Sequence, residues 1–305
     1  MRSDTISIDN APGSVTKVIF DTIKIGIIKS NLIAMFAGLS MALYVHHIPL
    51  FEKIGNIVLA FIGSSLVIGA AGVFNNLYDR DIDGIMERTR SRPTVTGVVS
   101  VTGGLAIGIW IALVGLFALY VASPLAALFG LLGLFIYVVP YTMWTKRKTV
   151  YNTEVGSLSG AMPPLIGWAA VSSDMLHPAI IALFLLMLIW QMPHFYAIAI
   201  RRLEEYRAAN IPMLPVVKGM RRTYVQMNAY LAALFLSSSL FWSFNPYIAA
   251  INAVLSLGWL VLSVVGYRRK EERTWARTMF IFSLNHMTVL MLLIIGYSLF
   301  GLLFA

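Results

Sequence analysis

Long apolar segments with little or no internal charge recur along this sequence and restrict what it can fold into. Each has roughly 20 residues, the length that an α-helix needs to cross the hydrocarbon core of a bilayer. The chain is 58% hydrophobic and only 12% charged, whereas about a quarter of the residues in an ordinary soluble domain are charged. We therefore predict an all-α, polytopic membrane bundle of about nine transmembrane helices. The expected spans are Ile27–Val45, Ile54–Phe74, Val101–Tyr120, Pro124–Tyr141, Val155–Val171, Pro178–Ile200, Tyr224–Trp242, Pro246–Tyr267 and Met279–Leu303.

The basic residues predict how this bundle is oriented. If the N-terminus is cytoplasmic, every one of the 23 Lys and Arg residues except Lys53 falls on the cytoplasmic side, with Lys29 at the cytoplasmic end of the first span, as the positive-inside rule requires. A wrong helix count would scramble this separation, so it favours nine crossings. We expect one membrane-embedded domain over residues 1–305, with a cytoplasmic segment at 1–24.

Composition also excludes several functions. The net charge of +9 follows from the topology, so it gives no reason to expect nucleic acid as a partner. The absence of cysteine excludes thiolate nucleophiles, disulfides and haem attachment through Cys-x-x-Cys-His. The N-terminus carries Asp4 and Asp9 and no apolar core, unlike a signal or transit peptide. We expect a bacterial inner (plasma) membrane.

The most informative polar segment follows the second apolar run and reads Asn75-Asn76-Leu77-Tyr78-Asp79-Arg80-Asp81-Ile82-Asp83. In a helix, Asn75, Asp79 and Asp83 would project from one face, whereas Asp81 would point about 160° away. Mg²⁺ prefers such hard oxygen ligands, and it usually takes one or two carboxylates beside phosphate oxygens and waters. We predict that Asn75, Asp79 and Asp83 hold Mg²⁺ and a diphosphate at the cytoplasmic edge. The alternative is that they are solvated groups or helix caps.

A second acidic segment occupies the related position four helices later. The loops Tyr78–Ser100 and Arg201–Thr223 each follow an apolar helix, carry acidic residues and continue through basic residues and proline. This match suggests a duplicated, quasi-symmetric bundle, in which Glu204 and Glu205 hold another metal opposite the first. The basic residues that could bind non-bridging diphosphate oxygens are Arg88, Arg92, Arg202 and Lys218.

At these residues the sequence resembles the UbiA superfamily of intramembrane prenyltransferases, whose first motif is Asn-x-x-x-Asp-x-x-x-Asp. Other segments resemble the branch that farnesylates haem, the haem O synthases, from about Lys29 to Gly219 and more weakly beyond. The family has Asp-Asp-Tyr where this chain has Glu204-Glu205-Tyr206, which shifts each carboxylate by one methylene. The segments that carry the resemblance are Met86-Glu87-Arg88-Thr89, Arg92-Pro93, Tyr141-Thr142, Lys146-Arg147-Lys148-Thr149, Asn152, 159–168, 190–195 and 211–216.

The resemblance implies a UbiA-like fold with farnesyl diphosphate and haem b as substrates and Mg²⁺ as cofactor. Ionisation of the allylic C–O bond, attack by the haem 2-vinyl group and capture of the resulting cation by water would give haem O and diphosphate. Lys146 and Arg147 then join the diphosphate-binding set, and Asn152 and Tyr206 become substrate contacts. Haem is a substrate rather than a permanent cofactor, and a haem A synthase or a terminal oxidase assembly is a candidate protein partner.

Two residues and two competing functions stay open. His194 lies at membrane depth, where an ionisable side chain is a functional candidate and imidazole is a common haem ligand. It could equally be a neutral group bonded to a neighbouring helix, and Asn152 could cap the helix that starts there. An aromatic quinone precursor could replace haem as the acceptor. A secondary transporter is disfavoured, because its polar groups should lie near the bilayer midplane.

Overall fold

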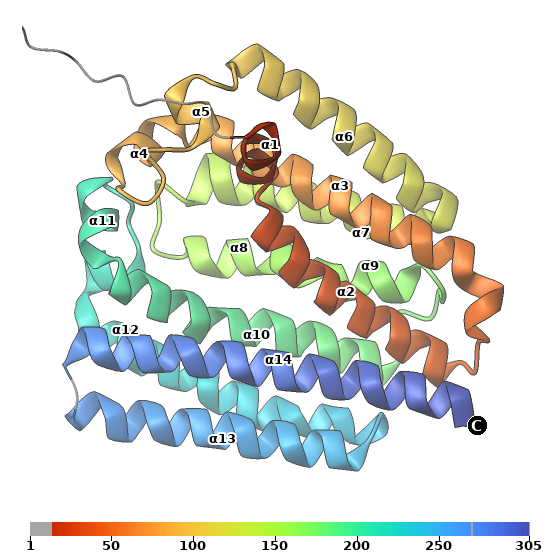
Figure 1. The fold of residues 1–305 in the computed structure, drawn as a ribbon. Helices are drawn as coiled ribbons and strands as arrows, with labels where there is room; N and C mark the ends of the chain where they lie inside the picture. Colours follow the sequence, from red (N-terminus) through yellow and green to blue (C-terminus); the bar gives the residue numbers. More distant parts are fainter. Residues whose placement is uncertain (1–13, 270, 305) are drawn as a thin grey trace, which may run out of the picture.

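Every regular element in the described part of the chain is helical. The computed structural model describes residues 14–269 and 271–304, so residues 1–13 of the expected cytoplasmic segment lie outside it. The long helices run side by side, and the short helices α4, α5 and α11 gather at one end (Figure 1). The long helices are α2 (Ile25–Val45), α3 (Ile54–Tyr78), α6 (Val101–Ala122), α7 (Pro124–Ile136), α10 (Pro178–Arg201), α12 (Leu214–Ser237), α13 (Pro246–Arg269) and α14 (Glu272–Phe304). The short elements are α1 (Val15–Ile23), η1 (Leu50–Lys53), α4 (Arg80–Ile85), α5 (Pro93–Thr96), the π-helical η2 (Tyr137–Thr145), α8 (Asn152–Gly160), α9 (Met162–Ala169), α11 (Leu203–Ala208) and η3 (Ser238–Ser243).

Seven helices in the described residues are long and apolar enough to cross a membrane, which makes the chain a multi-pass membrane protein. The other two expected spans are helical but differ from a continuous apolar helix. Residues 155–171 form α8 and α9, which are separated at Ala161. Pro163 and Pro164 follow this break, and they lack the N–H groups that would continue the helix. Residues 224–242 belong to α12 and to the 3-10 helix η3, which begins at Ser238, and α12 starts before this span, with non-helical dihedral angles at Gly219.

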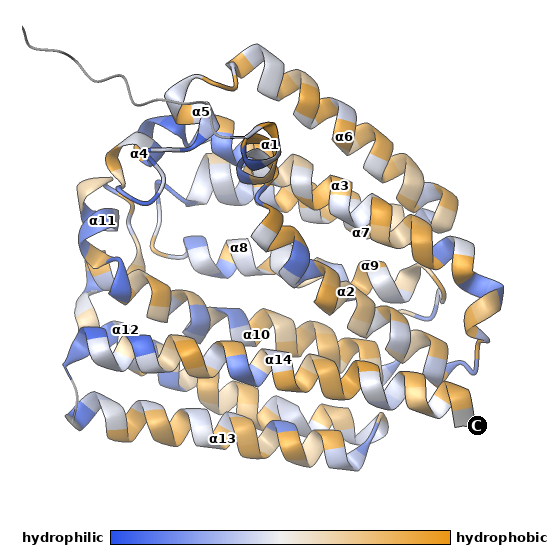
Figure 2. Ribbon diagram, in the orientation of Figure 1, coloured by the Kyte–Doolittle hydropathy of each residue, from blue (hydrophilic) through white to orange (hydrophobic). Residues whose placement is uncertain are grey.

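Polar residues collect at the end of the bundle that carries α4 and α11, and the long helices are mostly apolar beyond it, with a few polar patches within them (Figure 2). Both acidic loops lie at this end, where they share a small hydrophobic core. Ile82 and Met86 of the first loop pack with Ile211 and Met213 of the second, and Tyr206 lies against them. The two loops therefore converge, as their related positions in the sequence suggest.

Several helices at the opposite end begin in the same way, with a capping side chain followed by proline. The ring nitrogen Nδ1 of His177 accepts from the N–H of Ala179 at 3.2 Å, directly before Pro178 begins α10. Asn245 caps α13 by accepting two backbone N–H groups at 2.8 and 2.9 Å. Proline suits the first helical position because its missing N–H would have no partner there. These local signals fix where the spans begin.

Helix α2 crosses α9 with almost no space between their backbones. A Cβ atom on Gly38 would lie 2.8 Å from the Cα of Pro164, and one on Gly167 would lie 3.0 Å from the backbone nitrogen of Leu39. Small residues allow such approaches between membrane helices. The contact holds α9, and with it α8, against the first long helix.

Candidate active site

The junction between α3 and α4 presents the Asn75 motif to the protein interior. Backbone bonds run without interruption through it, from the N–H of Asp79 to Asn75 O at 2.9 Å and from the N–H of Asp83 to Asp79 O at 2.8 Å. Helical register is therefore kept although Asp79 ends α3. Asn75, Asp79 and Asp83 are 3%, 0% and 2% exposed, whereas the side chain of Asp81 is 62% exposed.

Asn75 links this junction to the π-helical segment η2. Its side-chain nitrogen donates to Asp79 Oδ2 at 2.8 Å and to Thr142 Oγ1 at 2.9 Å. Pro140 lies within the same segment, which removes one backbone donor and favours a π-helical distortion. Such distortions are common at functional sites. The amide of Asn75 is therefore held with its oxygen turned away from Asp79.

Lys146 and Arg147 extend from the end of η2 to the acidic residues. The ammonium group of Lys146 is paired with Asp79, and Arg147 reaches the other Asp79 oxygen at 3.4 Å. Arg147 also binds both oxygens of Asp81 at 2.7 Å and lies over the ring of Tyr78. The bond to Asp81 raises the pKa of Arg147, and the bond from Arg147 lowers the pKa of Asp81.

Two further cations complete the site. Arg92 is paired with Asp83, which is nearly fully buried, and Lys24 donates to Asn75 Oδ1 from the turn between α1 and α2. Lys24 has a left-handed backbone conformation, with φ of 56°, which breaks the helix and directs the side chain inward. Burial, together with the nearby charges of Arg92 and Lys146, lowers the pKa of Lys24 well below its usual value. Sequence reasoning placed Lys24 only among the cytoplasmic charges.

The second acidic pair is arranged differently. Glu204 is exposed and binds Arg207 at 2.7 Å, so the structure leaves it at the surface. Glu205 binds Arg202 at 2.6 Å, and its Oε2 atom is enclosed without a partner. No cluster of three or more His, Asp or Glu side chains suited to a metal occurs in residues 14–269 and 271–304. Within the described residues, Glu205 rather than Glu204 is therefore the enclosed member of this pair.

The remaining expected residues divide between the site and the surface. Tyr206 packs against the small core that contains Ile82 and Met86, which places it near the first motif. Asn152 is buried and donates to Thr149 O at 2.8 Å and to Pro212 O at 3.3 Å. It is not the cap of α8, because that position belongs to Tyr151. Arg88 and Lys218 are exposed and have no ion-pair partner among the described residues.

His194 is a residue of α10, and its side chain faces α14. Its Nδ1 atom is 2.7 Å from Ser283 Oγ, and its ring faces Trp190 at 4.6 Å and Phe280 at 5.3 Å between centroids. In the described part of the chain, Nε2 has no hydrogen-bond partner. Unlike the buried atoms that lack a partner, Nε2 is not fully enclosed by the protein. A fixed Nδ1 and a free Nε2 give the ring the orientation that imidazole ligands commonly have.

A buried Asn-Asp-Asp set at the polar end of a helical membrane bundle, surrounded by Lys and Arg, is the arrangement of an intramembrane prenyltransferase. The model of the UbiA prenyltransferase family matches residues 31–285. The chain belongs to this family. A protoheme IX farnesyltransferase of Shouchella clausii is 59% identical over the full length of both chains. Protoheme IX farnesyltransferase 1 of Bacillus cytotoxicus is 58% identical over 97% of each chain.

Solved structures share the fold at low sequence identity. One, of digeranylgeranylglyceryl phosphate synthase, superposes with a TM-score of 0.74 at 16% identity and covers 93% of this chain and 98% of its own. A UbiA homologue from Archaeoglobus fulgidus bound to GPP and Mg²⁺ has a TM-score of 0.68 at 16% identity, over 92% of this chain and 99% of its own. The fold expected from the resemblance is therefore confirmed.

Proposed function

We propose that this chain is a protohaem IX farnesyltransferase, or haem O synthase. It transfers the farnesyl group of farnesyl diphosphate to the 2-vinyl group of haem b. The allylic C–O bond breaks, a C–C bond forms to the vinyl group, and water adds to the resulting cation and loses a proton. The observation that carries the proposal is the 59% identity, over both full lengths, with a relative of that name.

The chemistry of the site fits Mg²⁺ and a diphosphate. Asn75, Asp79 and Asp83 offer amide and carboxylate oxygens, the hard ligands that Mg²⁺ takes, and their burial limits competition from water. The relative from Archaeoglobus fulgidus that shares the fold is bound to GPP and Mg²⁺. When bound, the metal neutralises negative charge that develops on the leaving diphosphate. Glu205, with its enclosed and unpartnered oxygen, is the candidate from the second loop.

The chain's own cations bind and orient the diphosphate. Lys24, Arg92, Lys146 and Arg147 approach the acids from three segments of the chain, so they surround whatever the acids hold. Arg202, in the second loop, is paired with Glu205 and would have to leave that partner to reach the diphosphate. Arg88 and Lys218 are exposed and need side-chain movement to take part. Charge-assisted bonds from these groups favour the diphosphate more strongly as its negative charge grows.

The haem acceptor is placed against His194, Asn152 and Tyr206. His194 supports this because Nδ1 is bound to Ser283 Oγ while no described residue forms a hydrogen bond with Nε2. With the basic loops on the cytoplasmic side of a bacterial inner membrane, α8 with α9, and α12 with η3, complete nine crossings from a cytoplasmic N-terminus. Haem O would then be released into the membrane, where a haem A synthase or a terminal oxidase assembly receives it.

A quinone-precursor acceptor is the second candidate, because UbiA family membership alone is compatible with it. The two functions are tested together. Purified protein receives farnesyl diphosphate and Mg²⁺ with haem b, or with 4-hydroxybenzoate, and the products are identified by mass spectrometry. We expect haem O from the first mixture, no prenylated benzoate from the second, and loss of product when EDTA removes the metal. Prenylated benzoate without haem O would refute the proposal.

A further inference from the structure

A cavity of about 320 Å³ lies where α10 ends and α14 begins, and none of its lining residues belongs to the buried Asn75 motif. It presents four guanidinium groups, one carboxylate and no large apolar side chain. Guanidinium groups bind carboxylates and phosphates through paired hydrogen bonds. The lining therefore suits an anion with several oxygens. The lining residues are Arg201, Arg202, Glu271, Arg273, Thr274 and Arg277.

Positive charge in this cavity is poorly compensated. Arg202 is paired with Glu205, and Glu271 accepts a hydrogen bond from Thr274 at 3.0 Å. Within the described residues, no carboxylate pairs with Arg201, Arg273 or Arg277. The guanidinium of Arg201 instead lies 4.6 Å from the ring centre of Phe280. An added anion would relieve this repulsion.

The position of one arginine is unfavourable for α14 itself. Arg273 lies in the first turn, where the helix dipole disfavours cations, and Arg277 follows one turn later. The positive-inside rule is satisfied by Lys or Arg anywhere in a cytoplasmic loop, so topology alone does not explain why four arginines converge on one cavity. Binding of an anion at the start of α14 does explain it.

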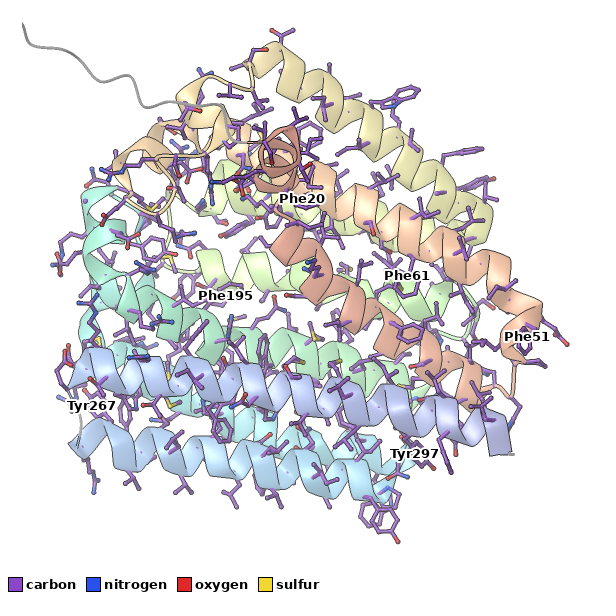
Figure 3. The ribbon with its side chains drawn as sticks, in the orientation of Figure 1. Phe20, Phe51, Phe61, Phe195, Tyr267 and Tyr297 are labelled. Carbon is purple, nitrogen blue, oxygen red and sulfur yellow. The ribbon has the colours of Figure 1, made fainter. Side chains whose placement is uncertain are left out.

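The start of α14 is held in place by aromatic packing. Trp275 lies between the two arginines in sequence, is 1% exposed and donates from Nε1 to Ser263 O at 3.1 Å. Tyr267, at the polar end of α13 (Figure 3), packs against Trp275 and stacks on Tyr224 at 3.8 Å. Because the start of α14 is rigid, Arg273 and Arg277 lose less conformational entropy when they bind a ligand.

Phe280 connects the cavity to His194. Its ring centre is 5.3 Å from that of His194 and 4.6 Å from the Arg201 guanidinium. Arg201 follows His194 by two helical turns along α10, which is about 10 Å. A ligand that spans both would need an apolar, aromatic body beside His194 and Phe280 and carboxylates at its polar edge. Haem b has this shape, with both propionates at one edge of the macrocycle.

We infer that the arginine cavity at the α10–α14 junction binds the propionate carboxylates of haem b, and so orients the macrocycle against His194. This inference rests on the proposed function, since it takes haem b as the acceptor. The carboxylates exchange hydration for bidentate bonds to Arg273 and Arg277. The diphosphate remains with the Asn75 motif and the cations that surround it, Lys24, Arg92, Lys146 and Arg147.

The test compares haem b with its dimethyl ester, which keeps the macrocycle but lacks carboxylates. Full-length protein in phosphatidylcholine nanodiscs is titrated with each, without farnesyl diphosphate, and binding is followed by haem absorbance. We expect the wild type to bind haem b about tenfold more tightly than the ester or better, as charge-assisted bonds predict. The R273Q/R277Q variant should lose this preference. R221Q/R222Q removes two exposed charges of α12 and should keep it.

Folding and alternative anions are controlled separately. R273Q/R277Q should bind farnesyl diphosphate as the wild type does. If this variant fails to fold, R273K/R277K takes its place, because it keeps the charge but loses the planar guanidinium group. It should partially lower the preference for haem b over the ester. An unchanged preference in a folded variant would overturn the inference. So would its loss when phosphatidylglycerol is added to the wild-type nanodiscs, because the cavity would then be a lipid headgroup site. Detection of haem O by mass spectrometry tests the proposed function independently of these binding preferences.

Discussion

Replacing Asp79 by Asn should abolish farnesyl transfer, whereas the same replacement at Asp81 should not. The two carboxylates are close in sequence and share Arg147 as a partner, and Asn has nearly the shape of Asp. They differ in burial, because Asp79 is fully enclosed and the Asp81 side chain is 62% exposed. The pair of variants therefore separates the role of a buried charge from that of an acidic residue in general.

The structure sets the size of the expected effects. Asp79 neutralises Lys146 and Arg147 inside the protein, and removing one partner of a buried ion pair costs about 3–5 kcal/mol. Loss of one preorganised group that stabilises charge in a transition state lowers kcat by about 10²–10³-fold. The exposed pair between Asp81 and Arg147 contributes at most about 1 kcal/mol. Activity should therefore fall at least a hundredfold in D79N and only slightly in D81N.

Haem O formation by the purified variants is measured by mass spectrometry at saturating farnesyl diphosphate, haem b and Mg²⁺. Rates are normalised to the protein that elutes as a single species and still binds haem b. Haem binding serves as the folding control because His194 and the arginine cavity share no residue with the Asn75 motif. If D79N keeps more than about a tenth of wild-type activity, well above the loss expected for such a group, the assignment of Asp79 is wrong. Equal losses in D79N and D81N would refute the argument from burial.

Three other matched changes test the packing, the caps and the second loop. Gly167→Ala should lower stability by about 1–3 kcal/mol through overpacking, because its Cβ would meet the backbone of α2, whereas Gly26→Ala meets nothing within 4 Å and should be neutral in thermal unfolding. Burial lowers the pKa of His177, so the unfolded chain takes up the proton first and stability should fall as the pH drops below about 6.5. His177→Asn keeps a capping acceptor without titrating, and the melting temperature should then lose this part of its dependence on pH. Glu205→Gln should raise the Mg²⁺ concentration needed for activity, whereas Glu204→Gln, at an exposed position, should leave it unchanged; equal effects would refute a metal role for Glu205.

The helices and the Asn75 motif could be predicted because their signals are local. An uncharged run of about 20 residues specifies a span by itself, and spacing by four places side chains on one helical face whatever surrounds them. The all-helical fold and the family were therefore confirmed. The division of residues 155–171 into α8 and α9 also has a local signal, because Pro163 and Pro164 most simply break or kink a helix at this point.

The residues that sequence reasoning missed depend on contacts between distant segments. Lys24 enters the site through a left-handed turn and meets Asn75, 51 residues later. Arg201 and Arg273 share a cavity although about 70 residues separate them. In the sequence, nothing distinguishes these residues from the other basic residues of the cytoplasmic segments. Glu204 is the opposite case. An acidic pair at a related position predicted a metal ligand there, but the Glu204 side chain is exposed and pairs with Arg207.

The pairing of acids and bases at the Asn75 motif explains how a membrane protein keeps so many charges buried before and after it binds substrate. An isolated buried carboxylate would be very costly, so Asp79 and Asp83 need Lys146, Arg147 and Arg92 as counter-ions when nothing else is bound. In the proposed function, a metal that neutralises the carboxylates would leave the same cations to bind the phosphate oxygens beside it. Each charge would then have a partner both with and without substrate, which is how an anionic substrate could bind among anionic side chains.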